Sequence, residues 1–170
     1  RSKNDYLEYF AIILKKGHLK KNPLVRIHSQ CITGDILDSL KCDCGSQLKK
    51  SIEIMSNNGG VLLYMPEEGR NIGLLNKLRA YEFQFHNIDT IDANYALGFD
   101  ADQRRHENAC ELLKLMGVSS VKLITNNPKK ISELQRCGIK VTSSVQIKVK
   151  VPAEAKKYLE TKKIRSGHNL

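Results

Sequence analysis

The sequence contains no tryptophan, and only 6% of its 170 residues are aromatic. This scarcity weighs against a binder of single-stranded nucleic acid, because such proteins stack bases on aromatic side chains. No apolar run approaches the roughly 20 residues of a membrane-spanning helix, and no signal-peptide pattern opens the chain. The hydrophobic content of 41% is typical of a globular protein. We therefore expect a soluble, cytoplasmic protein with no membrane partner.

Basic side chains outnumber acidic ones, and the formal net charge is +10. A basic surface suits phosphate-rich partners such as nucleic acid or a nucleotide triphosphate, but it is also common on solvated surfaces that bind nothing. Much of the excess lies in Lys15, Lys16, Lys20, Lys21 and the range 156–165, which we expect to be peripheral. Charge alone leaves the partner open.

The chain has the length of one domain with one continuous core, and no linker or repeat divides it. Short apolar runs alternate with segments whose apolar residues recur at helical spacing. We expect strands at 9–14, 24–29, 61–65, 121–125 and within 139–151, and helices at 48–55, 72–85, 106–116, 128–137 and from 152 onward. This order predicts a single α/β domain, a mixed β-sheet with helices packed on its faces.

The number of cysteines, five, is odd, which argues against a framework made only of disulfides. Cys31, Cys42 and Cys44 lie within fourteen residues of one another. Cys110 and Cys137 lie in apolar helical patterns, where we expect free cysteines buried as small hydrophobic side chains.

The close group of cysteines is a candidate metal site. Cys42 and Cys44 would point to opposite sides of an extended backbone, so binding one ion requires a turn, for which Gly45 offers conformational freedom. Thiolates favour zinc, and three protein ligands leave a fourth position for water, whose pKa zinc lowers to roughly 7. Two alternatives stay open: reduced structural cysteines, or a closed zinc site completed by His28 or Asp43.

Polar residues line or follow two of the expected strands. Arg26, His28 and Gln30 share one face of the strand that leads into the cysteines, although the outer face of an edge strand would look the same. Glu68 and Arg70 follow the next buried strand, where a carboxylate can pair with two adjacent guanine donors and a guanidinium with phosphate. Ligands of open α/β sheets bind at such strand ends, so these residues are candidate nucleotide contacts.

Two more polar segments precede helices. In the segment 125–130, lysines at the first helical turn could bind phosphate, although cations there oppose the helix dipole. In the segment 97–105, Asp100 or Asp102 could simply cap the helix that follows.

Five motifs stand in a fixed order along the chain: RIHSQCITGD at 26–35, CDCG at 42–45, EGRNIGL at 68–74, DQR at 102–104 and TNNPK at 125–129. In order and spacing they resemble the GTP cyclohydrolase II family, most clearly over 24–141. The resemblance implies that residues 1–170 form a domain that opens the imidazole ring of GTP. It would release formate and pyrophosphate and leave 2,5-diamino-6-ribosylamino-pyrimidinone 5′-phosphate, as the first step of riboflavin biosynthesis.

The resemblance also implies the binding residues. One zinc per subunit would be held by Cys31, Cys42 and Cys44. GTP, accompanied by magnesium on its triphosphate, would contact Arg26, Ile27, His28, Ser29, Gln30, Gln47, Glu68, Gly69, Arg70, Thr90, Thr125 and Lys130. The family usually forms a homodimer, and no nucleic-acid partner is implied.

Three catalytic residues are implied in the same way. Asp102 would accept a proton, Arg104 would be the nucleophile toward the α-phosphorus, and Tyr81 would help the second hydrolysis. Because a guanidinium stays protonated in proteins, Arg104 could instead stabilise phosphate charge. Two positions depart from the family pattern, since Gln30 replaces a glutamate and Arg105 replaces an acidic residue. We expect activity to survive both, with an effect of Gln30 on magnesium or nucleotide affinity.

The alternative hypothesis is a catalytically impaired, zinc-stabilised module that binds nucleotides or RNA. It is motivated by the net charge of +10 and by the two departures. Retention of Asp102 and Arg104 favours the enzyme. The chain begins at Arg1, so it could be a fragment of a longer or bifunctional protein.

Overall fold

The computed structural model describes residues 7–14, 19–86 and 88–169, so Lys15 and Lys16 lie outside the described residues. The described strands form one sheet in the order β1-β3-β2-β4-β5. They are β1 (Phe10–Leu14), β2 (Leu24–Ser29), β3 (Gly60–Met65), β4 (Ser120–Ile124) and β5 (Lys140–Val145). β1 is antiparallel to β3, whereas the other neighbouring strands are parallel. The predicted mixed sheet is confirmed.

The helices connect these strands. They are α1 (Ile32–Asp35), α2 (Cys44–Asn58), α3 (Glu68–Asn71), α4 (Gly73–Phe85), α5 (Thr90–Ala96), α6 (Glu107–Leu115), α7 (Pro128–Arg136) and α8 (Lys156–Ser166), with the 3-10 turn η1 (Ala153–Ala155). The five predicted helices are confirmed as α2, α4, α6, α7 and α8. Asn127 caps α7 by accepting the backbone N–H of Lys129. The other three are too short for a periodic pattern to reveal them.

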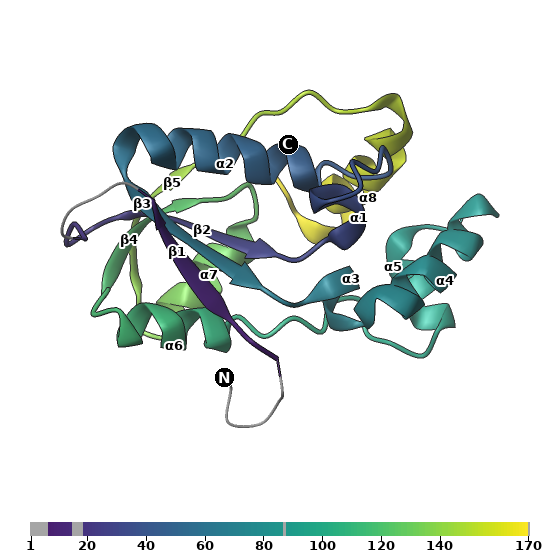
Figure 1. Ribbon diagram of the computed structural model, residues 1–170. Coiled ribbons are helices and arrows are strands. Elements are labelled where there is room, and N and C mark those ends of the chain that lie inside the picture. The colour runs from purple at the N-terminus through teal and green to yellow at the C-terminus, as the bar shows by residue number, and fades with distance from the viewer. Residues whose placement is uncertain (1–6, 15–18, 87, 170) are drawn as a thin grey trace.

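The sheet separates two helical layers (Figure 1). On one face α6 and α7 complete the larger core, which includes Val25, Ile27, Leu63, Leu113 and Leu134. On the other face Met55 of α2 packs with Leu62 and Ile124. Because side chains alternate along a strand, Arg26 and His28 of β2 lie on the face covered by α2. The predicted α/β class, with helices on the faces of the sheet, is confirmed.

Parallel strands β2, β3 and β4 end at the same edge of the sheet, and α4 and α5 extend beyond that edge (Figure 1). The C-terminal helix α8 packs against α5. No helix among the described residues has the length and apolar character needed to span a membrane. The edge where the parallel strands end is therefore the place where loops from distant parts of the chain meet.

Gly45 has a different role from the one predicted. It lies inside α2, and its φ is not positive. A Cβ added at Gly45 would lie 2.1 Å from the carbonyl oxygen of Gly34 in α1. The glycine is needed because the backbones of α1 and α2 touch there, and not because the chain turns at that residue.

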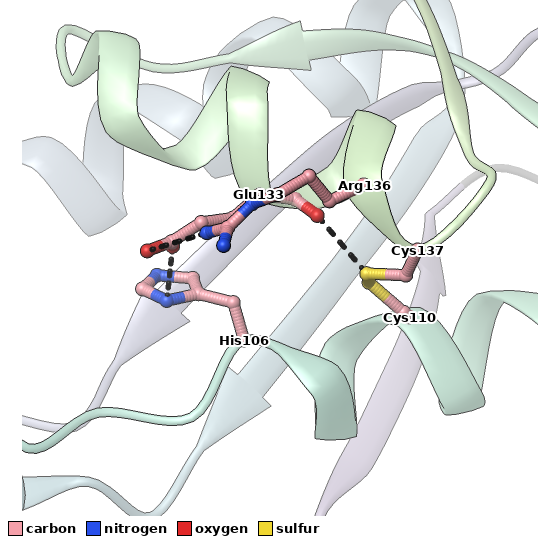
Figure 2. The surroundings of a disulfide bond; sticks show 5 residues. All are labelled: His106, Cys110, Glu133, Arg136 and Cys137. Atoms are coloured by element: carbon pink, nitrogen blue, oxygen red, sulfur yellow. Dashed lines mark hydrogen bonds and ion pairs between the residues drawn. A yellow bond between two sulfur atoms is a disulfide. The ribbon is translucent and has the colours of Figure 1, made fainter.

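The prediction that Cys110 and Cys137 are free is wrong. The two form a disulfide between α6 and the residue that follows α7, with their Cα atoms 6.3 Å apart (Figure 2). Beside it, His106 Nδ1 lies 2.7 Å from an Oε atom of Glu133. Both helices pack on the same face of the sheet, which brings together two cysteines that are 27 residues apart in sequence.

Candidate active site

A cavity of about 400 Å³ opens where the parallel strands end. Of the site residues predicted from the sequence, the cavity is lined by Arg26, His28, Ser29, Gln30, Cys31, Cys42, Cys44, Gln47, Glu68, Gly69, Arg70, Tyr81, Thr90, Asp102, Arg104, Thr125 and Lys130. Ile27 is the exception, because its side chain belongs to the core. Its carbonyl oxygen accepts a hydrogen bond from Lys130 Nζ at 2.9 Å. The fold thus gathers residues from segments spread between positions 26 and 130 around one space.

The three cysteines predicted to bind metal lie together in the wall of this cavity. Their Sγ atoms all lie within 4.8 Å of one another, and those of Cys31 and Cys42 are 3.7 Å apart. Two sulfurs bound to one tetrahedral zinc at about 2.3 Å would lie about 3.8 Å apart. Cys31 precedes α1 and Cys44 begins α2, so the packing of two helix starts sets this spacing. The spacing of the sulfur atoms fits a zinc ion.

The immediate surroundings of the three sulfurs show which other groups could help to hold such an ion. A Cβ at Gly34 would lie 2.7 Å from Cys42 Sγ, so the glycine makes room for the sulfurs. Among the described residues, no fourth His, Cys, Asp or Glu joins the group. His28 Nε2 lies 3.0 Å from both carboxylate oxygens of Asp35, and Asp43 is bonded to Lys162. The two residues considered as a fourth ligand are therefore engaged elsewhere.

Lys77, which the sequence did not single out, neutralises charge at the cysteines. Its Nζ lies 3.1 Å from Cys31 Sγ and 2.7 Å from Glu68 Oε1. Hydrogen bonds with Cys42 and Cys44, against the opposing effect of burial, lower the pKa of the Cys31 thiol, and the charge of Lys77 lowers it further. The same hydrogen bonds, with burial, raise the pKa of Cys42 and Cys44, so Cys31 is the sulfur most readily present as the thiolate that binds metal.

The Glu68 carboxylate is fully engaged within the protein. One oxygen accepts the N–H of Ile32 at 2.6 Å, and the other accepts the N–H of Gly69 and a hydrogen bond from Lys77. A guanine that paired with this carboxylate would have to share or replace these bonds. Glu68 joins the end of β3 to the loop that carries the cysteines.

The turn after Glu68 has an unusual backbone. Gly69, Arg70 and Asn71 have φ of 61°, 64° and 72°, in the left-handed region that non-glycine residues rarely adopt. Such strained conformations persist only where the surrounding structure holds them in place, and they are common at functional sites. Here Arg70 is held by a 3.0 Å hydrogen bond from its guanidinium to the carbonyl of Ala101, which leaves it at the cavity wall.

Buried cations form a second part of the wall. Arg26 and Lys130 each have only 7% of their surface exposed. Burial, followed by the charges of Arg104 and Arg26, lowers the pKa of Lys130 well below its usual value, and burial lowers that of Arg26 to about 10. The Nε of Arg26 has no hydrogen-bond partner among the described residues. So many like charges in one cavity are suited to a polyanionic ligand.

Asp102 and Arg104 form an ion pair at the cavity. The Nε of Arg104 donates to Asp102 Oδ1 at 2.8 Å, and a second guanidinium nitrogen donates to the other oxygen. Although burial opposes both shifts, this pairing lowers the pKa of Asp102 and raises that of Arg104. Asp102 is thus a carboxylate beside a protonated guanidinium. It does not cap α6, whose N-cap is His106.

The remaining predicted residues also line the cavity. Tyr81 of α4 has its hydroxyl 3.3 Å from Thr33 Oγ1, and burial raises its pKa. Thr90 begins α5, and Thr125 Oγ1 accepts the N–H of Asn127 at 3.0 Å. His28 presents an Nδ1 that has no partner among the described residues. Burial lowers the pKa of His28 and so favours the neutral imidazole, in which one ring nitrogen can accept a hydrogen bond.

Comparison with known proteins places the chain in a family. A family model described as GTP cyclohydrolase II matches residues 1–146. The chain belongs to the GTP cyclohydrolase II family. The family resemblance inferred from the five motifs is confirmed, and it extends beyond the range 24–141 in which those motifs lie.

Several curated relatives of this GTP cyclohydrolase II family member are named riboflavin biosynthesis protein RibBA. That of Staphylococcus epidermidis is 46% identical over 164 residues, covering 96% of this chain and 42% of the relative. That of Staphylococcus saprophyticus is 45% identical over 164 residues, with the same coverage. That of Staphylococcus aureus is 43% identical over 166 residues, covering 98% of this chain and 42% of the relative. The chain spans less than half the length of these relatives.

The prediction that the lysines of 156–165 are peripheral is wrong for Lys162. Its side chain is only 12% exposed, and it lines the cavity with other residues of the C-terminal segment, Tyr158, Arg165, Ser166 and His168. Lysines are mostly exposed in proteins, so the sequence carried no signal for a buried one. Other residues of the wall that the sequence analysis missed are Lys41, Glu67, Lys77, Asn94 and Asn126.

Proposed function

We propose that this family member opens the imidazole ring of GTP, releasing formate and pyrophosphate, in the first step of riboflavin biosynthesis. The observation that carries the proposal is that three sulfurs at zinc spacing and a group of buried cations face the same 400 Å³ cavity. A zinc site alone or a basic surface alone would fit many functions. Their combination in one cavity suits a purine triphosphate whose base lies near a metal.

Cys31, Cys42 and Cys44 would hold one zinc ion per chain. When bound, zinc polarises a substrate and lowers the pKa of water to roughly 7, which is the chemistry that ring hydrolysis requires. The contribution of this chain is to keep the three sulfurs close together and to favour the thiolate of Cys31. Gly34 provides the space for them, and Lys77 provides the charge beside Cys31.

The buried cations would bind the triphosphate, together with magnesium. The GTP contacts that we propose are Arg26, the backbone of Ile27, His28, Ser29, Gln30, Gln47, Glu68, Gly69, Arg70, Thr90, Thr125 and Lys130. Asp102 would accept a proton, and Tyr81 would orient water for the second hydrolysis. Because Arg104 is held protonated by Asp102, it is better suited to neutralise charge at the α-phosphate than to attack phosphorus.

The assembly and setting of the chain are also proposals. We propose that all of 1–170 forms this domain and that it works as a homodimer in the cytoplasm. Leu75, Leu78 and Phe85 of α4 are 64%, 45% and 76% exposed, and a second copy would cover such an apolar stripe.

The test is an assay with GTP, magnesium and zinc-loaded protein, in which formate and pyrophosphate are both measured. The expected result is release of both, which stops when zinc is removed by a chelator and resumes when zinc is restored. Absence of turnover by pure, zinc-replete protein would overturn the proposed activity. Tight RNA binding with a steep salt dependence, and no turnover, would instead support the binding module.

A further inference from the structure

The C-terminal helix α8 lies beyond residues 1–146, the range that the family model matches, yet it reaches the metal-binding loop. Lys162 Nζ lies 2.8 Å from Asp43 Oδ1, and Asp43 stands between Cys42 and Cys44 in the chain. The Asp43 carboxylate is only 2% exposed, so its charge is neutralised from α8 and not by solvent. A residue far from the motifs therefore borders the metal-binding cysteines.

From Asp43 the polar contacts continue to Arg26, one of the buried cations that we propose bind the triphosphate. The second oxygen of Asp43 accepts a hydrogen bond from Gln47 Nε2 at 2.5 Å. Gln47 Oε1 in turn accepts one from Arg26 NH2 at 2.7 Å, and Arg26 NH1 donates to the carbonyl of Ile124 at 3.3 Å. An unbroken chain of polar contacts thus links α8, the cysteine loop and a buried arginine.

Lys162 is itself held in place from more than one side. Its Nζ lies 4.3 Å from the centre of the Tyr158 ring, which is within the range of a cation–π contact. The nearby Tyr158, Cys44 and Asp43 raise the pKa of Lys162 in spite of its burial. The side chain is a fixed cation, so it can orient the carboxylate that it contacts.

We propose that Lys162 is a positioning residue of this site, which fixes the cysteine loop through Asp43 and aims Arg26 through Gln47. The role rests on the proposed function, since zinc and a nucleotide triphosphate are the groups that the loop and Arg26 would hold. Partners just outside a metal's own ligands typically change metal affinity about tenfold to a hundredfold when they are removed. A side chain that only tied α8 to the rest of the protein would not have this effect.

The test compares three variants of the full chain. Lys162→Met removes the cation, Lys162→Arg keeps it, and Lys163→Met removes an exposed lysine that does not line the cavity. Zinc release from each loaded protein to a chelating dye is followed over time, and kcat and KM for GTP are measured separately. Thermal unfolding of each variant reports whether it is folded.

The expected result is zinc release at least about tenfold faster from Lys162→Met, with a raised KM for GTP, and near-parental values for the other two variants. If Lys162→Met does not fold, Asp43→Asn replaces it, and the same acceleration is expected. If zinc release from Lys162→Met, or from Asp43→Asn where that variant replaces it, is within twofold of the rate for Lys163→Met, the proposed role is overturned. Zinc release is measured without turnover, so a zinc-binding protein that fails to open GTP would overturn the proposed function alone. A parent protein that binds no zinc would overturn both.

Discussion

Two regions of this molecule bury cysteines in opposite surroundings. At the strand ends, Cys31, Cys42 and Cys44 lie beside Lys77 and a cavity lined by charged groups. On the face covered by α6 and α7, a disulfide links α6 to the residue that follows α7 and packs against the apolar core (Figure 2). The first region contains charged groups that a ligand would neutralise. The second contains a cross-link and apolar contacts that stabilise the fold. Substitutions in the first region should change chemistry more than stability, and those in the second should do the reverse.

The largest effect is expected for Cys42→Ala. Removing one of three sulfurs should reduce zinc content well below one per chain and lower formate release to less than about 1% of the parent, because the water would lose the metal that activates it. The measurements are zinc content by atomic absorption and formate by a coupled assay. Cys137→Ala is the matched control and should keep its zinc. Full ring opening by zinc-free Cys42→Ala would contradict the assignment of a catalytic metal.

Asp102→Asn should lower kcat by about a hundredfold or more, because the carboxylate that we propose accepts a proton is lost while the side chain keeps its size. Zinc content should not change. Asp100→Asn is the matched control, since Asp100 lies in the same turn, is exposed and does not line the cavity. Equal losses of kcat in both variants would show that the turn, and not the carboxylate of Asp102, matters.

Substitutions at the disulfide should change stability and leave activity nearly unchanged. Cys137→Ala should lower the free energy of unfolding by about 3 kcal/mol under oxidising conditions, because the unfolded chain loses a cross-link across 27 residues. Urea unfolding measures this change, and kcat should stay near that of the parent. Thiol titration of the denatured, metal-free parent should find three thiols before reduction and five after it. Five thiols before reduction would contradict the disulfide.

The smallest effect on stability, of opposite sign, is expected for Lys130→Met. Its amine is buried beside Arg26 and Arg104, so its removal should stabilise the ligand-free protein by about 1 kcal/mol while raising KM for GTP about tenfold. The folded protein binds the Lys130 proton less tightly than the unfolded chain. The unfolding free energy of the parent should therefore rise with pH between the lowered pKa and the usual 10.5, and the variant should lack this rise. A less stable variant with unchanged KM would contradict this description.

The sequence predicted the fold well where patterns are long. All five strands and the five longer helices were found, because apolar periodicity over many residues leaves few alternatives. Helices α1 and α3, with four residues each, show no period, and the left-handed turn at Arg70 follows from packing rather than propensity. Sequence patterns predict structure that neighbouring residues determine, whereas these short helices and this turn depend on contacts with other parts of the chain.

The sequence motifs predicted many of the residues that line the cavity. Each predicted contact except Ile27 lines the cavity. Lys77 and Lys162 were missed because their partners, Cys31 and Asp43, are 46 and 119 residues away in the sequence. The disulfide was missed for the same reason, since either of its cysteines could have been an ordinary core residue. Pairings between distant elements become visible only when the sheet has brought those elements together.

X-ray absorption at the zinc edge tests the central claim most directly. The purified, zinc-loaded protein should show one zinc per chain, surrounded by three sulfurs at about 2.3 Å and one lighter neighbour at about 2.0 Å. Addition of GTP should perturb the lighter neighbour and leave the sulfurs in place. A shell of four protein ligands, or a fully folded protein that retains no metal, would contradict an open zinc centre facing the cavity.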